Sequence, residues 1–188
     1  MAKPLLIVVT GRPASGKTTL SRILARETRC PLISRDEMKE GYINTDCAYD
    51  VGPPDTATQH IYNTFFETIG LLLSRNISIV AEAAFQHKLW HPHLTSLSAT
   101  TDIRIIVCDI SPELARTRFI ARIKADAGRE KFHGDGAELL QHPDDSLLTS
   151  YKAPDMPIPT LHVDTTENYN PAVAEMIKFI RQGRKLTS

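Results

Sequence analysis

Short apolar runs alternate along the chain with segments in which apolar residues recur at helical spacing. The runs, each of strand length, are 5–9, 31–34, 77–82, 103–109 and 160–164. The helical patterns between and after them begin near residues 18, 55, 86, 111 and 170. Strands that alternate with helices in this way are typical of α/β proteins with a parallel sheet. The pattern therefore predicts an α/β fold.

Polar stretches rich in turn-forming residues interrupt this pattern. Residues 41–54 are expected to form a loop on the open face. Residues 128–145 are polar and contain glycine, so we expect a surface segment there, and we place a lid at about 124–145. In the helix expected over 86–97, His91-Pro92 is predicted to interrupt the helix or to start a new turn.

Composition narrows the class of protein. A chain of 188 residues is predicted to form one domain, 1–188. Its 22 basic and 22 acidic residues cancel, so no broad positive field attracts nucleic acid or anionic lipid. Three widely spaced cysteines without a CxxC pair favour reduced thiols. The first apolar run is too short for a membrane span, and we expect a soluble, cytoplasmic protein with no membrane partner.

The strongest chemical signal follows the first apolar run. Residues Gly11-Arg12-Pro13-Ala14-Ser15-Gly16-Lys17-Thr18 match the phosphate-loop pattern GxxxxGK[ST] in full. The backbone N–H groups of such a loop surround phosphate oxygens, while Lys17 reaches the outer phosphates and the Thr18 hydroxyl can bind Mg²⁺. We therefore predict that residues Gly11 to Thr19 bind a nucleotide, with ATP and Mg²⁺ as cofactors. The alternative is a glycine-rich turn that binds nothing.

Acidic residues at predicted strand ends supply candidates for the chemistry beside the phosphate. Asp36 and Arg35 follow the second strand, and ligands of open α/β sheets bind at the carboxyl ends of strands. Asp36 could accept the proton of an acceptor hydroxyl and Arg35 could hold the acceptor, although a helix cap beside a solvated arginine is the alternative.

Glu82 and Asp109 end the third and fourth predicted strands. One of them is expected to support Mg²⁺, through water, because this ion keeps several waters and takes few protein carboxylates. We favour Glu82, since Asp109 could instead lead into the cap of the following helix. Glu82 also joins Arg35 and Asp36 as a candidate substrate contact.

The helix predicted after residue 111 carries arginines on one face. Arg118 and Arg122 lie four residues apart, and Arg129 follows close to three full turns after Arg118 if the helix continues. Such a cluster is what a lid that closes over ATP requires, whereas a solvated basic face is the alternative. Arg118 and Arg122 therefore join Lys17 and Asp36 as candidate catalytic residues, and Arg122 is also a candidate nucleotide contact.

Three histidines lie close together in the sequence and raise the question of a metal site. His87 and His91 could share a helix face. We reject a metal site because Pro92 disturbs the helix and no cysteine or carboxylate completes a set. His87, His91 and His93 are more simply surface or core residues, or part of an acceptor pocket. His133 is a separate candidate for contact with the substrate or the lid.

With these residues in place, the chain resembles small AAA-type P-loop kinases. This group includes gluconate and shikimate kinases, chloramphenicol phosphotransferase, zeta-toxin-like kinases and the kinase domain of phage polynucleotide kinase. The phosphate loop carries the most specific part of the resemblance. Ile33-Ser34-Arg35-Asp36-Glu37 is similar to the polynucleotide kinase pattern in which an Asp after Arg is the general base. Residues 118–140 are similar to the lid of gluconate-type kinases.

The resemblance implies a P-loop NTP hydrolase fold. It suggests a five-stranded parallel sheet in the order 2-3-1-4-5, with helices on both faces and a lid segment. It also implies that Asp36 is the base and that Arg118 or Arg122 contacts ATP.

Four functions are compatible with these features. The leading hypothesis is transfer of the ATP γ-phosphoryl group to a hydroxyl group of an unidentified small-molecule acceptor. A 5′-hydroxyl polynucleotide kinase is favoured by the likeness around Asp36 and disfavoured by neutral charge and few aromatic residues. A nucleotide-dependent switch or ATPase acting on a partner protein is another class, although no NKxD sequence is present for guanine selection. A noncatalytic nucleotide-binding module is the last.

Overall fold

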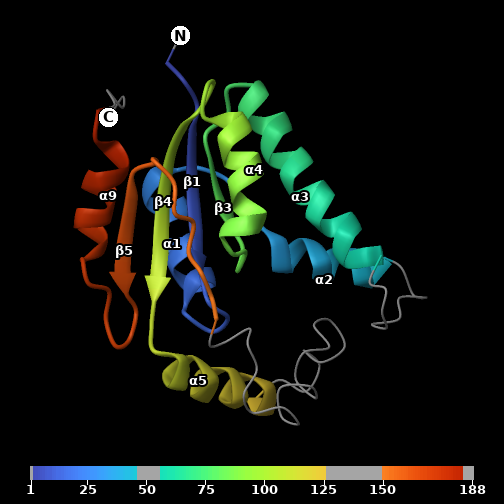
Figure 1. The fold of residues 1–188 in the computed structure, drawn as a ribbon, viewed down its shortest axis with the longest axis vertical. Coiled ribbons are helices and arrows are strands. Elements are labelled where there is room, and N and C mark those ends of the chain that lie inside the picture. Colours follow the sequence, from blue (N-terminus) through green and yellow to red (C-terminus); the bar gives the residue numbers. More distant parts are fainter. Residues whose placement is uncertain (1, 46–55, 126–149, 184–188) are drawn as a thin grey trace.

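A parallel sheet organises the chain in the computed structural model, which describes residues 2–45, 56–125 and 150–183. Within these residues, five strands pair in the order β2-β3-β1-β4-β5 (Figure 1). They are β1 (Leu5–Gly11), β2 (Leu32–Ser34), β3 (Ile79–Glu82), β4 (Asp102–Asp109) and β5 (Thr160–Asp164). The predicted fold class and strand order are confirmed.

Helices cover both faces of this sheet (Figure 1). Side chains alternate between the faces of a strand, and the buried residues of β1 accordingly join two different cores. One core includes residues of α1 (Lys17–Thr28) and α9 (Val173–Arg181), and the other those of α3 (Thr56–Ser74) and α4 (His87–Leu97). α5 (Pro112–Ala125) lies beyond the carboxyl ends of the strands.

Two helices differ from the prediction. The first, α2 (Arg35–Thr45), includes residues that we expected in a loop, whereas the rest of that loop, 46–54, lies outside the described residues. α4 runs on through Pro92, where an interruption was expected. Trp90 and Leu94, which lie before and after the proline, are 0% exposed. Tertiary packing of a helix face outweighs local turn signals of this kind.

α3 packs the apolar stripe that its spacing predicted. Ile61, Phe65 and Ile69 are at most 3% exposed, and Phe65 and Ile69 pack with residues of the sheet and of α4. Within the described ranges, no helix combines the length and the apolar character needed to cross a bilayer. The apolar residues of α3 thus contribute to the hydrophobic core.

Gly11 ends β1 at a point of close backbone contact. Its φ is 149° and its partner in register is Cys108 of β4. A Cβ atom at this position would lie 2.5 Å from the Cys108 carbonyl oxygen and 2.7 Å from Ser15 Oγ. The first of these neighbours is backbone in the centre of the sheet and cannot move aside alone. The fold thus requires glycine at the start of the loop.

We predict that Gly11→Ala lowers the free energy of unfolding by about 1–3 kcal/mol, because it forces this contact apart. The matched control is Gly70→Ala within α3, where an added Cβ meets no atom within 4 Å. There, alanine is expected to stabilise the helix by up to about 1 kcal/mol. Urea unfolding of both variants measures the difference. Equal stability of the two would contradict the prediction.

Candidate active site

The phosphate loop lies between β1 and α1, at the edge where the strands end. Gly16 precedes α1 with a φ of 83°, a conformation that glycine adopts without strain. The residue makes no side-chain cap, so the first backbone N–H groups of α1 can face an anion. Lys17 is 7% exposed, and its Nζ donates to the Arg12 carbonyl oxygen at 3.2 Å. The predicted phosphate-binding residues therefore surround one helix N-terminus.

Thr165, directly after β5, holds the phosphate loop in place through hydrogen bonds. Its hydroxyl lies 2.7 Å from the Ser15 carbonyl oxygen and 3.2 Å from the Asp109 carbonyl oxygen. Its backbone N–H also donates to Asp109, at 3.0 Å. Thr165 is 6% exposed, so water competes little for these contacts. The loop is thereby joined to the ends of β4 and β5.

Glu82, the last residue of β3, is buried at the same edge. In register it pairs with Val9 of β1 and Ser34 of β2, and its Oε2 accepts a hydrogen bond from the Ser34 hydroxyl at 2.8 Å. Glu82 is only 1% exposed. Burial raises the pKa of its carboxyl group, while the positive charge of Lys17 acts in the opposite direction. Glu82 thus lies within electrostatic reach of the loop lysine.

Asp36 lies in the first turn of α2, directly after β2. Its Oδ1 accepts a hydrogen bond from Arg35 Nη1 at 3.3 Å, and its side chain is 44% exposed. Its charge contributes to the raised pKa of Glu82, so the two carboxyl groups share one electrostatic environment. An acid in a first turn also stabilises the helix. Asp36 therefore combines solvent access with a position at the edge that holds the phosphate loop.

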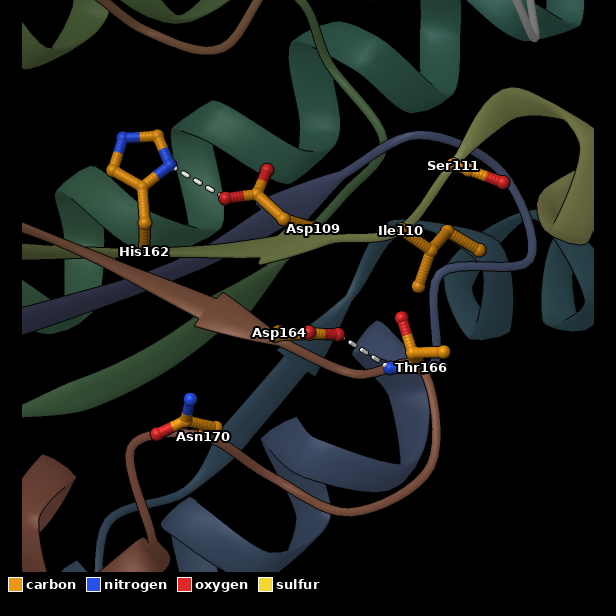
Figure 2. Close-up of a pocket in the computed structure, with 7 residues that line it drawn as sticks. All are labelled: Asp109, Ile110, Ser111, His162, Asp164, Thr166 and Asn170. Atoms are coloured by element: carbon orange, nitrogen blue, oxygen red, sulfur yellow. Dashed lines mark hydrogen bonds and ion pairs between the residues drawn. The ribbon is translucent and has the colours of Figure 1, made fainter.

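Asp109, the competing strand-end acid, interacts with the edge strand instead. Its Oδ2 lies 2.7 Å from Nδ1 of His162 on β5, and both side chains are more than half exposed (Figure 2). The two residues line a surface pocket of about 420 Å³ that Ser111 and Asp164 also border. Glu82 and Asp109, the two alternatives for supporting Mg²⁺, thus have different surroundings. Glu82 is buried beside the phosphate loop, whereas Asp109 is exposed beside β5.

α5 brings two of the predicted arginines to the phosphate loop. Ser111 caps the helix as expected, because its Oγ accepts a hydrogen bond from the Leu114 N–H at 3.2 Å. Arg118 and Arg122 then border a pocket of about 150 Å³, together with Ala14 and residues 16–19. The four-residue spacing of these arginines predicted that they share a helix face, and both reach the same pocket.

The guanidinium groups of the two arginines make different contacts. Arg118 donates from Nη1 to the Thr165 carbonyl oxygen at 3.0 Å, and from Nη2 to that of Thr166. Arg122 packs over the ring of Phe119, with 5.4 Å between its Cζ and the ring centroid. Arg118 thus links α5 to residues 165–166, next to the contact between Thr165 and the phosphate loop.

The histidines of α4 are held by packing and by hydrogen bonds. The His93 ring stacks on Phe66, with 3.5 Å between centroids, and its Nε2 lies 2.9 Å from the Tyr62 hydroxyl. Burial lowers the pKa of His93. His87 Nδ1 accepts a hydrogen bond from the Asp155 N–H at 3.0 Å. In the part of the chain that the structure describes, no group of three or more His, Cys, Asp or Glu residues is arranged to hold a metal.

Some predicted residues lie outside the described part of the chain. They are Arg129, His133 and most of the lid segment over 124–145, and their roles stay predictions. The structure also adds contacts that sequence reasoning missed, those of Thr10, Tyr151 and Thr165. Each of these side chains bonds to residues at least 56 positions away. No local pattern could reveal such partners.

The strand order, together with a phosphate loop at the N-terminus of α1, is that of a P-loop kinase-like fold. Residues 6–141 match the AAA domain family AAA_33, and the chain belongs to this family. The predicted likeness to small P-loop kinases is thereby confirmed. No curated protein matches the chain.

Solved structures have the same fold. A candidate kinase from Chloroflexus aurantiacus is 27% identical, with a TM-score of 0.76 over 97% of this chain and 96% of that one. A gluconokinase from Sinorhizobium meliloti is 18% identical, with a TM-score of 0.60 over 97% and 94%. A chain of the Pnkp1/Rnl/Hen1 RNA repair complex is 18% identical, with a TM-score of 0.57 over 75% and 46%. The last two show the fold alone.

The raised pKa of Glu82 has a consequence for stability. A carboxyl group whose pKa is higher in the folded than in the unfolded state binds its proton more tightly when folded. Its contribution to stability therefore falls as pH rises from the unfolded pKa through the folded pKa, and remains lower above it. At neutral pH, the charge of Glu82 opposes folding relative to a neutral group of the same shape.

We predict that Glu82→Gln, which can still accept a hydrogen bond from Ser34, is more stable than the wild type at neutral pH without nucleotide. The advantage should shrink toward acid pH, where Glu82 is itself protonated. Urea unfolding between about pH 4 and pH 8 measures it. The control is Glu67→Gln, on the exposed side of α3. A loss of stability at neutral pH, relative to this control, would contradict the prediction.

Proposed function

We propose that the protein transfers the γ-phosphoryl group of ATP to a hydroxyl group of a small-molecule acceptor. The observation that carries this proposal is the convergence of three features at one sheet edge: the phosphate loop, the buried Glu82 and the accessible Asp36. Membership of a P-loop kinase-like family supports a kinase. The preference for a small-molecule acceptor is inferred from the zero net charge and the few aromatic residues of the chain and not from its relatives.

In this proposal the phosphates of ATP lie against residues 11–19. The N–H groups at the start of α1 donate to phosphate oxygens, and Lys17 exchanges its contact with the Arg12 carbonyl oxygen for a phosphate oxygen. Arg118 and Arg122 border the same pocket. Cations in these positions stabilise the charge that develops on the transferred group.

Mg²⁺ suits the oxygen donors that the chain offers here. The Thr18 hydroxyl borders the loop pocket, and the Glu82 carboxyl group lies near Lys17 at the same edge. Both are hard oxygen ligands, and Mg²⁺ takes few of them from a protein because it keeps waters and binds phosphate oxygens. Thr18 would hold the ion directly and Glu82 through water. When bound, it neutralises charge on the terminal phosphates.

Asp36 is the proposed general base. Its exposed carboxylate accepts the proton of the acceptor hydroxyl, whose oxygen forms the new bond to the γ-phosphorus. The bond between that phosphorus and the bridging oxygen breaks, and its electron pair stays with ADP. Arg35, which donates to Asp36, keeps the carboxylate oriented. In this way a single acid performs the proton transfer while the loop and the arginines stabilise charge.

We predict that Asp36→Asn lowers kcat by about 10²–10⁴-fold with little change in nucleotide affinity, because it removes only the base. Lys17→Ala is expected to weaken both ATP binding and transfer. A coupled assay of ADP release, over sugars, nucleosides, antibiotics and 5′-hydroxyl oligonucleotides, measures both. The control is Glu37→Gln. Glu37 follows Asp36 in the first turn of α2, and its exposed carboxylate forms an ion pair with Arg22 of α1. An undiminished rate in Asp36→Asn would exclude Asp36 as the base.

A 5′-hydroxyl polynucleotide kinase is the second candidate. The sequence Arg35-Asp36 after β2 favours it, since it resembles the base motif of those enzymes. This function requires contacts with several phosphates, so the affinity for a 5′-hydroxyl oligonucleotide should fall steeply with salt. We expect a shallow slope, in keeping with the zero net charge. Fluorescence anisotropy across a salt series measures the slope, and a steep one accompanied by transfer would favour the polynucleotide acceptor.

The remaining alternatives give different results in the same assay. A noncatalytic module would bind ATP without transfer to any acceptor, and Asp36→Asn would change nothing. A switch or ATPase would release ADP with water as the acceptor, and a partner protein would change its rate. Only a kinase releases ADP in amounts that match a phosphorylated acceptor.

A further inference from the structure

A buried group of polar side chains lies directly behind the phosphate loop. Its centre is Thr10, the residue before Gly11, which is 0% exposed. The Thr10 hydroxyl donates to the Phe85 carbonyl oxygen at 3.1 Å. The same hydroxyl oxygen accepts a hydrogen bond from Trp90 Nε1 at 3.2 Å and lies 2.9 Å from the Tyr151 hydroxyl. Three distant parts of the chain, near residues 10, 85–90 and 151, therefore meet at one oxygen atom.

The chemistry of the partners fixes the direction of each hydrogen bond. An indole N–H can only donate and a carbonyl oxygen can only accept, whereas a hydroxyl has one proton and two acceptor positions. Thr10 uses its proton on Phe85 and one acceptor position on Trp90. The Tyr151 hydroxyl must therefore donate to Thr10.

Tyr151 is itself held in place by the segment that it begins. This segment precedes β5 along the chain and crosses the sheet beside β4 and α4 (Figure 1). Lys152 accepts a hydrogen bond from the His87 N–H at 2.9 Å, and the Asp155 N–H donates to His87 Nδ1 at 3.0 Å. Burial raises the pKa of Tyr151, so the phenol remains the proton donor that Thr10 requires.

We propose that Tyr151 is a positioning residue that restrains the start of the phosphate loop by fixing Thr10, the residue directly before Gly11. The loop must hold its N–H groups in one orientation to receive phosphate oxygens, and Gly11 has no side chain to restrain it. Tyr151 supplies that restraint through its hydrogen bond to Thr10, while Thr165 holds the Ser15 carbonyl oxygen. The consequence for catalysis rests on the proposed function, whereas the restraint itself does not.

The test compares Tyr151→Phe with Tyr62→Phe. Tyr62 packs against Phe66 and Phe85, and its hydroxyl forms hydrogen bonds to His93 and to the Leu89 carbonyl oxygen, away from Thr10. Two readouts are needed: the hydrogen exchange rate of the Gly11 amide by NMR without nucleotide, and the Kd for Mg-ATP by calorimetry. Thermal unfolding of both variants shows whether they lose comparable stability.

We expect Tyr151→Phe to raise the exchange rate of the Gly11 amide and to weaken Mg-ATP binding by about five- to tenfold relative to Tyr62→Phe, as the loss of one buried hydrogen bond implies. Thr10→Val should reproduce these effects and Thr10→Ser should largely avoid them, because serine keeps the hydroxyl. The double variant Tyr151→Phe with Thr10→Val should be no worse than the more affected single variant.

The two proposals fail in distinguishable ways. If the wild type binds no nucleotide while Tyr151→Phe still raises the Gly11 exchange rate, the proposed function is wrong and the restraint stands. If the wild type binds Mg-ATP and Tyr151→Phe matches Tyr62→Phe in both affinity and Gly11 exchange, Tyr151 is an ordinary core residue and the inference is overturned.

Discussion

Parallel pairing of β1 with strands on both sides is the constraint on which the candidate site depends. The register sets Val9 level with Glu82 and Gly11 level with Cys108, so the loop that leaves β1 begins where both neighbours end. Pairing of β2 with β3 then brings Ser34 level with Glu82, which delivers Asp36 to the same edge. A shift of this register by one residue would turn each of these side chains to the opposite face.

Hydrogen bonds from buried polar side chains hold the phosphate loop in this position. Thr165 holds the Ser15 carbonyl oxygen from the side of β4 and β5, while Thr10 and Tyr151 act from the side of β3 and α4. The loop is therefore restrained on two sides, although it has few side chains that could anchor it. Backbone N–H groups that do not reorient are what electrostatic stabilisation of a phosphate requires.

Features that depend on a local pattern of residues could be predicted from the sequence, whereas contacts between distant residues could not. Buried runs such as 103–109 and the spacing of Gly11, Gly16 and Lys17 predicted the strands and the loop. α2 was missed because its inward residues include Lys39, which is 5% exposed and offers no apolar pattern. The contact between Thr10 and Tyr151 spans 141 positions, so it arises only once the chain has folded.

Strand β2 continues directly into α2, and this determines how firmly Asp36 is held in place. Ser34 ends the strand and Arg35 begins the helix, with no residue between them. Asp36 is therefore carried by the sheet, whereas a base on a loop would move independently of it. Under the proposed function, groups that select an acceptor could change without displacing Asp36, because the proposed proton acceptor is held by the sheet. Such a separation of chemistry from recognition would let one scaffold serve many acceptors.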